Sequence, residues 1–163
     1  PLQIVDGLRL PVLGGPVEIR LALGANRCVW NLQMAEPTLT LCLRSPDEAP
    51  RVLEQVLRTR ARALFAERLA HYAPLLGVGV PRLSLSAART RWGSCSQRTG
   101  IRLNWRLIHF PPPVVDYLVA HEVAHLREMN HSPGFWSIVA RLCPDYRSAR
   151  DELKRLAAVC PHW

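Results

Sequence analysis

The sequence predicts a domain of the α+β class. Between residues 8 and 44 apolar and polar residues alternate, as they do in strands with one buried face. The run Ser45-Pro46-Asp47 then ends this pattern and can cap a long helix from about Glu48 to Tyr72. Further along, residues 115 to 129 place apolar side chains three and four positions apart, which is typical of an amphipathic helix. Strands and helices are therefore both expected.

The expected strands fall into two groups. In the first, turn residues separate three alternating runs, which predicts an antiparallel meander; the alternating apolar residues are Val17, Ile19, Leu21, Leu23, Trp30, Leu32, Met34, Leu39, Leu41 and Leu43. In the second group, Leu83 and Leu85 form one short strand, and Ile101 to Leu107 form another. We expect these two strands to pair as a hairpin across Trp92 to Gly100.

The length of 163 residues fits one domain, so we predict a single domain over 1–163, with a β-meander subregion (1–46) and a core (47–163). No run approaches the roughly 18 apolar residues of a membrane span. The start carries no basic-then-apolar signal peptide, and because it opens on Pro1 we expect an initiator methionine or a longer leader to precede it. The five cysteines are odd in number and contain no CxxC pair, which favours free thiols and a cytoplasmic location.

The net charge of +8 is carried by twenty arginines and one lysine. Such a basic surface could attract DNA. The arginines are nevertheless spread along the whole chain without a dense run, and the near absence of lysine beside abundant alanine, leucine and proline points to a codon bias of the genome. Association with DNA therefore stays one of two alternatives.

The segment HEVAHLREMNH, from His121 to His131, carries the strongest functional pattern. Residues advance about 100° each along a helix, so His121 and His125 lie on one face, one turn apart. Two imidazoles placed in this way can bind one Zn²⁺ ion, and Glu122 lies close enough to act on a water molecule at an open coordination position. His131 can supply a third imidazole if the chain turns after Met129, and turn residues (Asn130, Ser132, Pro133, Gly134) follow there. The pattern predicts a zinc site.

The remaining helices flank this segment. Pro112 and Pro113 are typical of a helix start, so the metal-binding helix is expected to begin there. Ser132 and Pro133 can start a second helix through about Leu142, and Pro144-Asp145 opens a third helix from Tyr146 to Val159.

The run from Thr90 to Trp136, TRWGSCSQRTGIRLNWRLIHFPPPVVDYLVAHEVAHLREMNHSPGFW, resembles the YgjP-like zinc metallopeptidase family, which is akin to the WLM and SprT proteases that act on DNA–protein crosslinks. The resemblance implies a minimal zincin-like fold with a small sheet packed on the metal-binding helix. It also implies that His121, His125 and His131 bind zinc and that Glu122 is the catalytic acid and base. The substrate would be a protein or peptide. Val123 is a buried apolar replacement in the family's HELAH form.

Several secondary roles have two interpretations each. Glu128 either accepts a hydrogen bond that orients an imidazole or is an exposed carboxylate. The loop TRWGSCSQRTG is either a structural turn or a substrate contact, and Cys95 has no neighbour that would activate it as a nucleophile. The strand from Ile101 to Leu107 could bind an extended peptide along its edge. For the donor to the oxyanion, Tyr146 and Arg147 are the candidates.

Two other classes of protein remain open at this point. One is a zinc-stabilised module that binds DNA or protein with little catalysis, and the other is a structural protein in which the motif is accidental. Trp92, Trp105 and Trp136 favour core or cleft-wall roles over base stacking.

Overall fold

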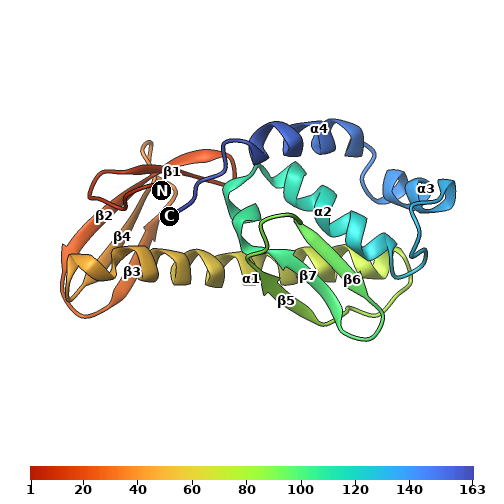
Figure 1. The fold of residues 1–163 in the computed structure, drawn as a ribbon, viewed down its shortest axis with the longest axis horizontal. Helices are drawn as coiled ribbons and strands as arrows, with labels where there is room; N and C mark the ends of the chain where they lie inside the picture. The colour runs from red at the N-terminus through yellow and green to blue at the C-terminus, as the bar shows by residue number, and fades with distance from the viewer.

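A single long helix runs through the whole molecule (Figure 1). The computed structural model describes residues 1–163. Helix α1 (Ala49–Leu75) has 27 residues and follows a short 3-10 turn, η1 (Pro46–Glu48), whose capping box joins Ser45 and Glu48. Its buried residues recur every three or four positions, as expected for a helix with one apolar face: Ala49, Val52, Leu53, Leu57, Ala61, Phe65, Leu69, Tyr72 and Ala73. One end of α1 lies against the first sheet and the other against the second sheet and α2.

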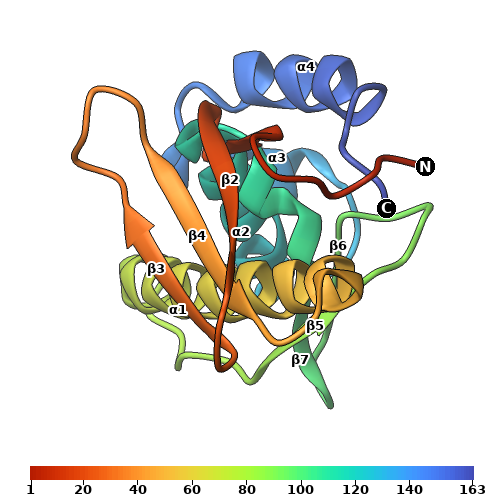
Figure 2. The ribbon, with the colours of Figure 1, turned by 90° about the vertical axis from the view of Figure 1, so that its left-hand side faces the viewer.

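The first sheet is mixed, with the order β1-β2-β4-β3. Its strands are β1 (Arg9–Val12), β2 (Gly15–Leu23), β3 (Arg27–Asn31) and β4 (Thr38–Leu43). The predicted meander is wrong at one pairing: β1 and β2 are antiparallel and so are β3 and β4, but β2 and β4 are parallel. Five of the six residues of β4 are buried, whereas β3 is mostly exposed. Because burial favours the centre of a sheet, β4 lies between β2 and β3 (Figure 2).

The second sheet has the order β5-β7-β6 and contains a strand that the sequence did not predict. Its strands are β5 (Leu83–Ser86), β6 (Gly93–Ser96) and β7 (Gly100–Asn104). The predicted hairpin is therefore wrong: β5 and β7 pair in parallel, and β7 forms its hairpin with β6. Gly100 has a φ of +91°, and a Cβ atom there would collide with the carbonyl oxygen of Arg82, so this turn requires glycine.

The strand β7 is also shorter than predicted. It ends at Asn104, whose side chain accepts a hydrogen bond from the Arg106 amide and caps a 3-10 helix, η2 (Trp105–His109). Trp105 and Leu107 are buried there, as their alternation predicted, but in a helical turn. The expected role of Trp105 in the core agrees with its 1% exposure.

Three further helices complete the fold: α2 (Pro112–Ala124), α3 (Pro133–Leu142) and α4 (Tyr146–Ala157). Helix α2 ends at Ala124 with His125 as its C-cap, so the predicted extension to Met129 is wrong, and the Met129 side chain is 48% exposed. Ser132 caps α3 by accepting a hydrogen bond from the Phe135 amide at 3.2 Å, as predicted.

The predicted α+β class is confirmed, since four helices accompany two small mixed sheets. One contiguous apolar cluster joins both sheets to α1 and α2. Helix α2 is buried almost all round, whereas residues 127–130 after it are exposed, so the end of α2 lies at the margin of this core. The two termini meet, and the Leu2 amide donates to the His162 carbonyl oxygen at 2.8 Å. No helix is both long enough and apolar enough to cross a bilayer.

Candidate metal centre

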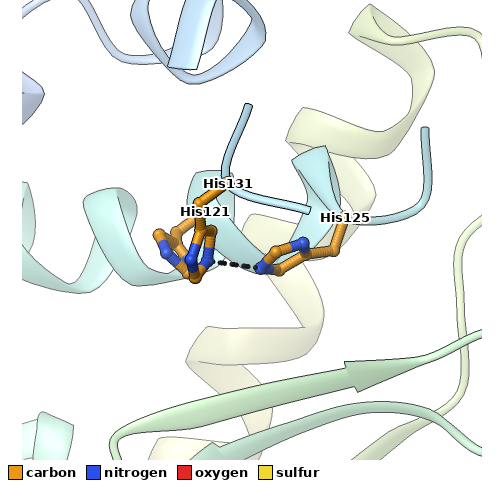
Figure 3. A group of neighbouring side chains, drawn as sticks. All are labelled: His121, His125 and His131. Carbon is orange, nitrogen blue, oxygen red and sulfur yellow. Dashed lines mark hydrogen bonds between the residues drawn. The ribbon is translucent and has the colours of Figure 1, made fainter. Parts of the chain in front are cut away.

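Three imidazoles converge where α2 ends (Figure 3). His121 lies in the last turn of α2, His125 is its C-cap, and His131 follows in the connection to α3. One ligand atom from each of the three lies within 4.8 Å of the others, and Nε2 of His125 is 3.1 Å from Nε2 of His131. The early end of α2 lets the chain turn back, which brings residue 131 beside the two helix histidines.

The ring of His125 is held in a defined orientation. Its Nδ1 lies 3.0 Å from the main-chain carbonyl oxygen of Glu128, so Nδ1–H donates and Nε2 keeps its lone pair for a metal. The ring of Phe135 stacks on that of His125, with the two ring centroids 4.4 Å apart. The carboxylate of Glu128 is exposed, so of the two interpretations of this residue the exposed one holds, and its backbone provides the acceptor.

The electrostatics favour a neutral, metal-ready His131. Partial burial lowers its pKa, and the neighbouring His121 and His125 lower it further, while Glu122 opposes the shift. Neutral imidazoles are good ligands for zinc and related divalent ions, and the Nε2 atoms of His125 and His131, 3.1 Å apart, are close enough to bind one ion together. The three residues therefore fit a single divalent metal ion.

Glu122 lies directly beside this cluster and is only 3% exposed. Its Oε2 is 3.1 Å from Nδ1 of His121. The backbone of β6 also lies close to this carboxylate. A Cβ atom at Gly93 would lie only 2.9 Å from Oε2 and 3.1 Å from Cγ of Glu122, so the position has room for glycine alone. The sequence did not identify Gly93 as part of the site. Its place in the WGSC run, within a loop considered as a substrate contact, was the one signal that pointed to it.

The loop TRWGSCSQRTG thus contributes to the site through β6. Cys95 lies in that strand, and burial, reinforced by the charge of Glu122, raises the pKa of its thiol to about 11. A thiol with such a pKa stays protonated and is a poor nucleophile, as expected from the sequence. On the sheet, Arg91, Arg102 and several hydroxyl side chains line a hollow of about 500 Å³ together with Cys95.

An aromatic wall borders the imidazoles. The Trp136 ring lies 5.9 Å from that of His131 and 5.8 Å from that of His121, which agrees with the cleft-wall role expected for it. Tyr146 is buried and stacks on Trp136 at 5.4 Å, whereas Arg147 is exposed and lies over the ring of Tyr146. Of the two candidate oxyanion donors, only Tyr146 therefore belongs to this wall.

These features define an α+β domain with a candidate metal site and a buried carboxylate, which is the architecture of a metal-dependent hydrolase. The chain belongs to the YgjP-like metallopeptidase family: the family model described as "YgjP-like, metallopeptidase domain" matches residues 1–156. The family resemblance noted in the sequence is thereby confirmed, and a metallopeptidase family implies proteins or peptides as substrates. Comparisons with curated proteins and with solved structures found no match.

Proposed function

We propose that the protein is a zinc-dependent peptidase in which His121, His125 and His131 bind the metal and Glu122 is the general base and acid. The observation that carries this proposal is the convergence of three imidazole nitrogens within 4.8 Å, next to a carboxylate that is 3% exposed. The orientation of His125 by a main-chain carbonyl supports it, because such contacts commonly fix metal-binding imidazoles.

Bound zinc would polarise the scissile carbonyl and lower the pKa of water to about 7. Glu122 then accepts the proton of the attacking water and delivers it to the leaving amine. Its burial and the close backbone of Gly93 restrict the directions in which the carboxylate can point. The carboxylate is therefore positioned before substrate binds, which is the arrangement that proton transfer at a fixed atom requires.

The substrate-binding strand differs from the sequence-based hypothesis. The segment from Ile101 belongs to β7, which is the central strand, so β5 and β6 already occupy both of its edges and no peptide can be added there. The strand β6 has one unpaired edge and packs against α2. We infer that an extended peptide pairs with β6, which would place the peptide next to Glu122.

The experiment pairs Glu122→Gln with the unaltered protein. Both are loaded with zinc, and cleavage of a proteome-derived peptide library is followed by mass spectrometry. We expect Glu122→Gln to keep its zinc and to lose about 10² to 10⁴-fold in rate, because it retains the shape of the side chain but not the base. Equal cleavage by both proteins would contradict the assigned role of Glu122.

A second candidate function, a zinc-stabilised module that binds DNA, is favoured by the net charge of +8 and by Arg91 and Arg102, which form no ion pair beside β6. Phosphate contacts would make DNA affinity fall steeply with salt. Steep salt dependence together with an absence of cleavage from the library would favour this function over the peptidase.

A further inference from the structure

One guanidinium in the aromatic wall lacks any acidic partner. The Cζ atom of Arg150, on α4, lies 5.4 Å from the ring centroid of Trp136 and 5.7 Å from that of Tyr146. Its Nε atom is buried and makes no hydrogen bond. None of the ion pairs of the chain includes Arg150. This side chain is therefore held by stacking alone.

An unpaired buried N–H group costs free energy, so it calls for an explanation. The same fold can pair an arginine fully: Nε of Arg68 donates to Oδ1 of Asp116 at 2.8 Å, and a further nitrogen donates to Oδ2 at 3.3 Å. Arg150 lies against two aromatic rings, yet no carboxylate of the chain forms an ion pair with it. Nε is the only Arg150 nitrogen that is buried without a partner, so the two terminal nitrogens are the ones that a ligand can reach. Stacking fixes the direction of that end of the guanidinium, and its two N–H groups match a carboxylate in a two-point contact.

The location of Arg150 connects it to the metal centre. Trp136, which the guanidinium covers, also contacts the ring of His131 at 5.9 Å, so Arg150 lies one aromatic ring away from the imidazoles. Tyr117 also borders the metal centre, since its ring is 5.9 Å from that of His121. Burial raises the pKa of Tyr117, the charge of Arg150 opposes this and that of Glu122 reinforces it, so the phenol lies within electrostatic range of both.

We propose that Arg150 binds a carboxylate of the peptide substrate and so selects where the chain is cut. This rests on the proposed peptidase function. Because Trp136 separates the guanidinium from the imidazoles, the partner is a carboxylate some distance from the scissile bond rather than the oxyanion formed at it. Two sources share this chemistry: the C-terminal carboxylate of the substrate, and an acidic side chain near the cleaved bond.

The test uses zinc-loaded Glu122→Gln protein, which binds peptides without cutting them. Three probes are compared: acetyl-tetra-alanine with a free C-terminus, its C-terminal amide, and the amide of acetyl-Ala-Glu-Ala-Ala. We expect one of the two carboxylate peptides to bind about tenfold or more tightly than the tetra-alanine amide. Preference for the free C-terminus identifies the terminal carboxylate as the ligand, and preference for the glutamate peptide identifies the side chain.

Substitutions then assign the effect to Arg150. Arg150→Gln in the same background should abolish the tenfold difference, and Arg150→Lys, which keeps the charge but not the planar edge, should reduce it. Arg155→Gln is the matched control, because it removes one positive charge from the exposed side of the same helix. Equal affinity for all three peptides, or a preference that survives Arg150→Gln, would overturn the proposal.

A second readout needs no substitution at residue 150. In ¹⁵N-arginine-labelled protein, the Nε–H resonance of Arg150 should shift on titration with the preferred peptide and not with the amide. An unmoved resonance would overturn the proposal even if the variants failed to fold. Zinc content, measured first, keeps the two hypotheses apart: protein without zinc contradicts the proposed function, whereas zinc-loaded protein without carboxylate preference contradicts only the role of Arg150.

Discussion

Replacing Gly93 with alanine should impair catalysis without releasing the metal. The new Cβ atom would lie 2.9 Å from Oε2, 3.1 Å from Cγ and 3.2 Å from Cδ of Glu122, whereas ordinary contacts begin at 3.4 Å. The carboxylate or the β6 backbone must therefore move by about half an ångström. A misplacement of about 1 Å can cost on the order of 10² in rate, so we expect a loss of about tenfold.

Gly79→Ala is the matched control, since a Cβ atom at Gly79 meets nothing within 4 Å. Both variants and the unaltered protein are compared for zinc content, melting temperature and initial rate on one peptide chosen from the library screen. We expect equal zinc in all three and a lower rate only for Gly93→Ala. A Gly93→Ala protein with full activity, or one that loses its zinc, would refute the inference that β6 positions the Glu122 carboxylate.

Two further predictions concern stability. Burial lowers the pKa of His109 from 6.5 to about 4, although its Nδ1–H donates to the Pro11 carbonyl oxygen. Above pH 6.5 His109 is neutral in both the folded and the unfolded protein. Between pH 6.5 and pH 4 it is protonated in the unfolded chain but not in the folded one, which stabilises the unfolded state. Acidification to pH 4 should therefore lower the free energy of unfolding by about 3 kcal/mol. Urea denaturation against pH should show this loss, and His109→Gln should lack it; parallel curves for the two proteins would contradict the assignment. Ser132→Ala removes the cap of α3 and should cost about 1 kcal/mol in the same assay, with Ser137→Ala, an exposed residue of that helix, as the control. Equal stability of the two serine variants would show that the cap contributes nothing.

The metal segment was the part of the site most open to prediction. The four-residue spacing of His121 and His125 is a local helical relation, and the turn residues around His131 predict that the chain reverses there. The structure brings all three rings together. The end of α2 was misplaced because apolar spacing continues to Met129, whereas the backbone leaves the helix after Ala124. The roles of the three histidines as zinc ligands, and the role of Glu122 as the general base, stay predictions.

Long-range contacts were beyond local patterns. The parallel pairing of β2 with β4 and of β5 with β7 depends on which strands become neighbours in the folded sheet, and alternation alone does not distinguish parallel from antiparallel neighbours. The strand β6 is short and polar, with all four residues half-buried, so no periodicity marks it. The contact of Gly93 with Glu122 joins elements far apart in the chain, so local patterns do not predict it. The same holds for the absence of an acidic partner beside Arg150, which depends on every element packed around it.

Some sequence-based expectations are not tested by the fold. The single-domain organisation over 1–163 stays a prediction. The cytoplasmic location also stays a proposal, which the five unpaired cysteines support. Association with DNA likewise stays a proposal.

Metal analysis of the purified protein tests the central claim most directly. We predict one zinc ion per chain, retained in His162→Ala, which alters an exposed histidine of the C-terminal tail, and lost in His131→Ala. Protein that binds no divalent metal, or a His131→Ala variant that keeps its zinc with unchanged affinity, would contradict the claim that these three imidazoles form a metal site.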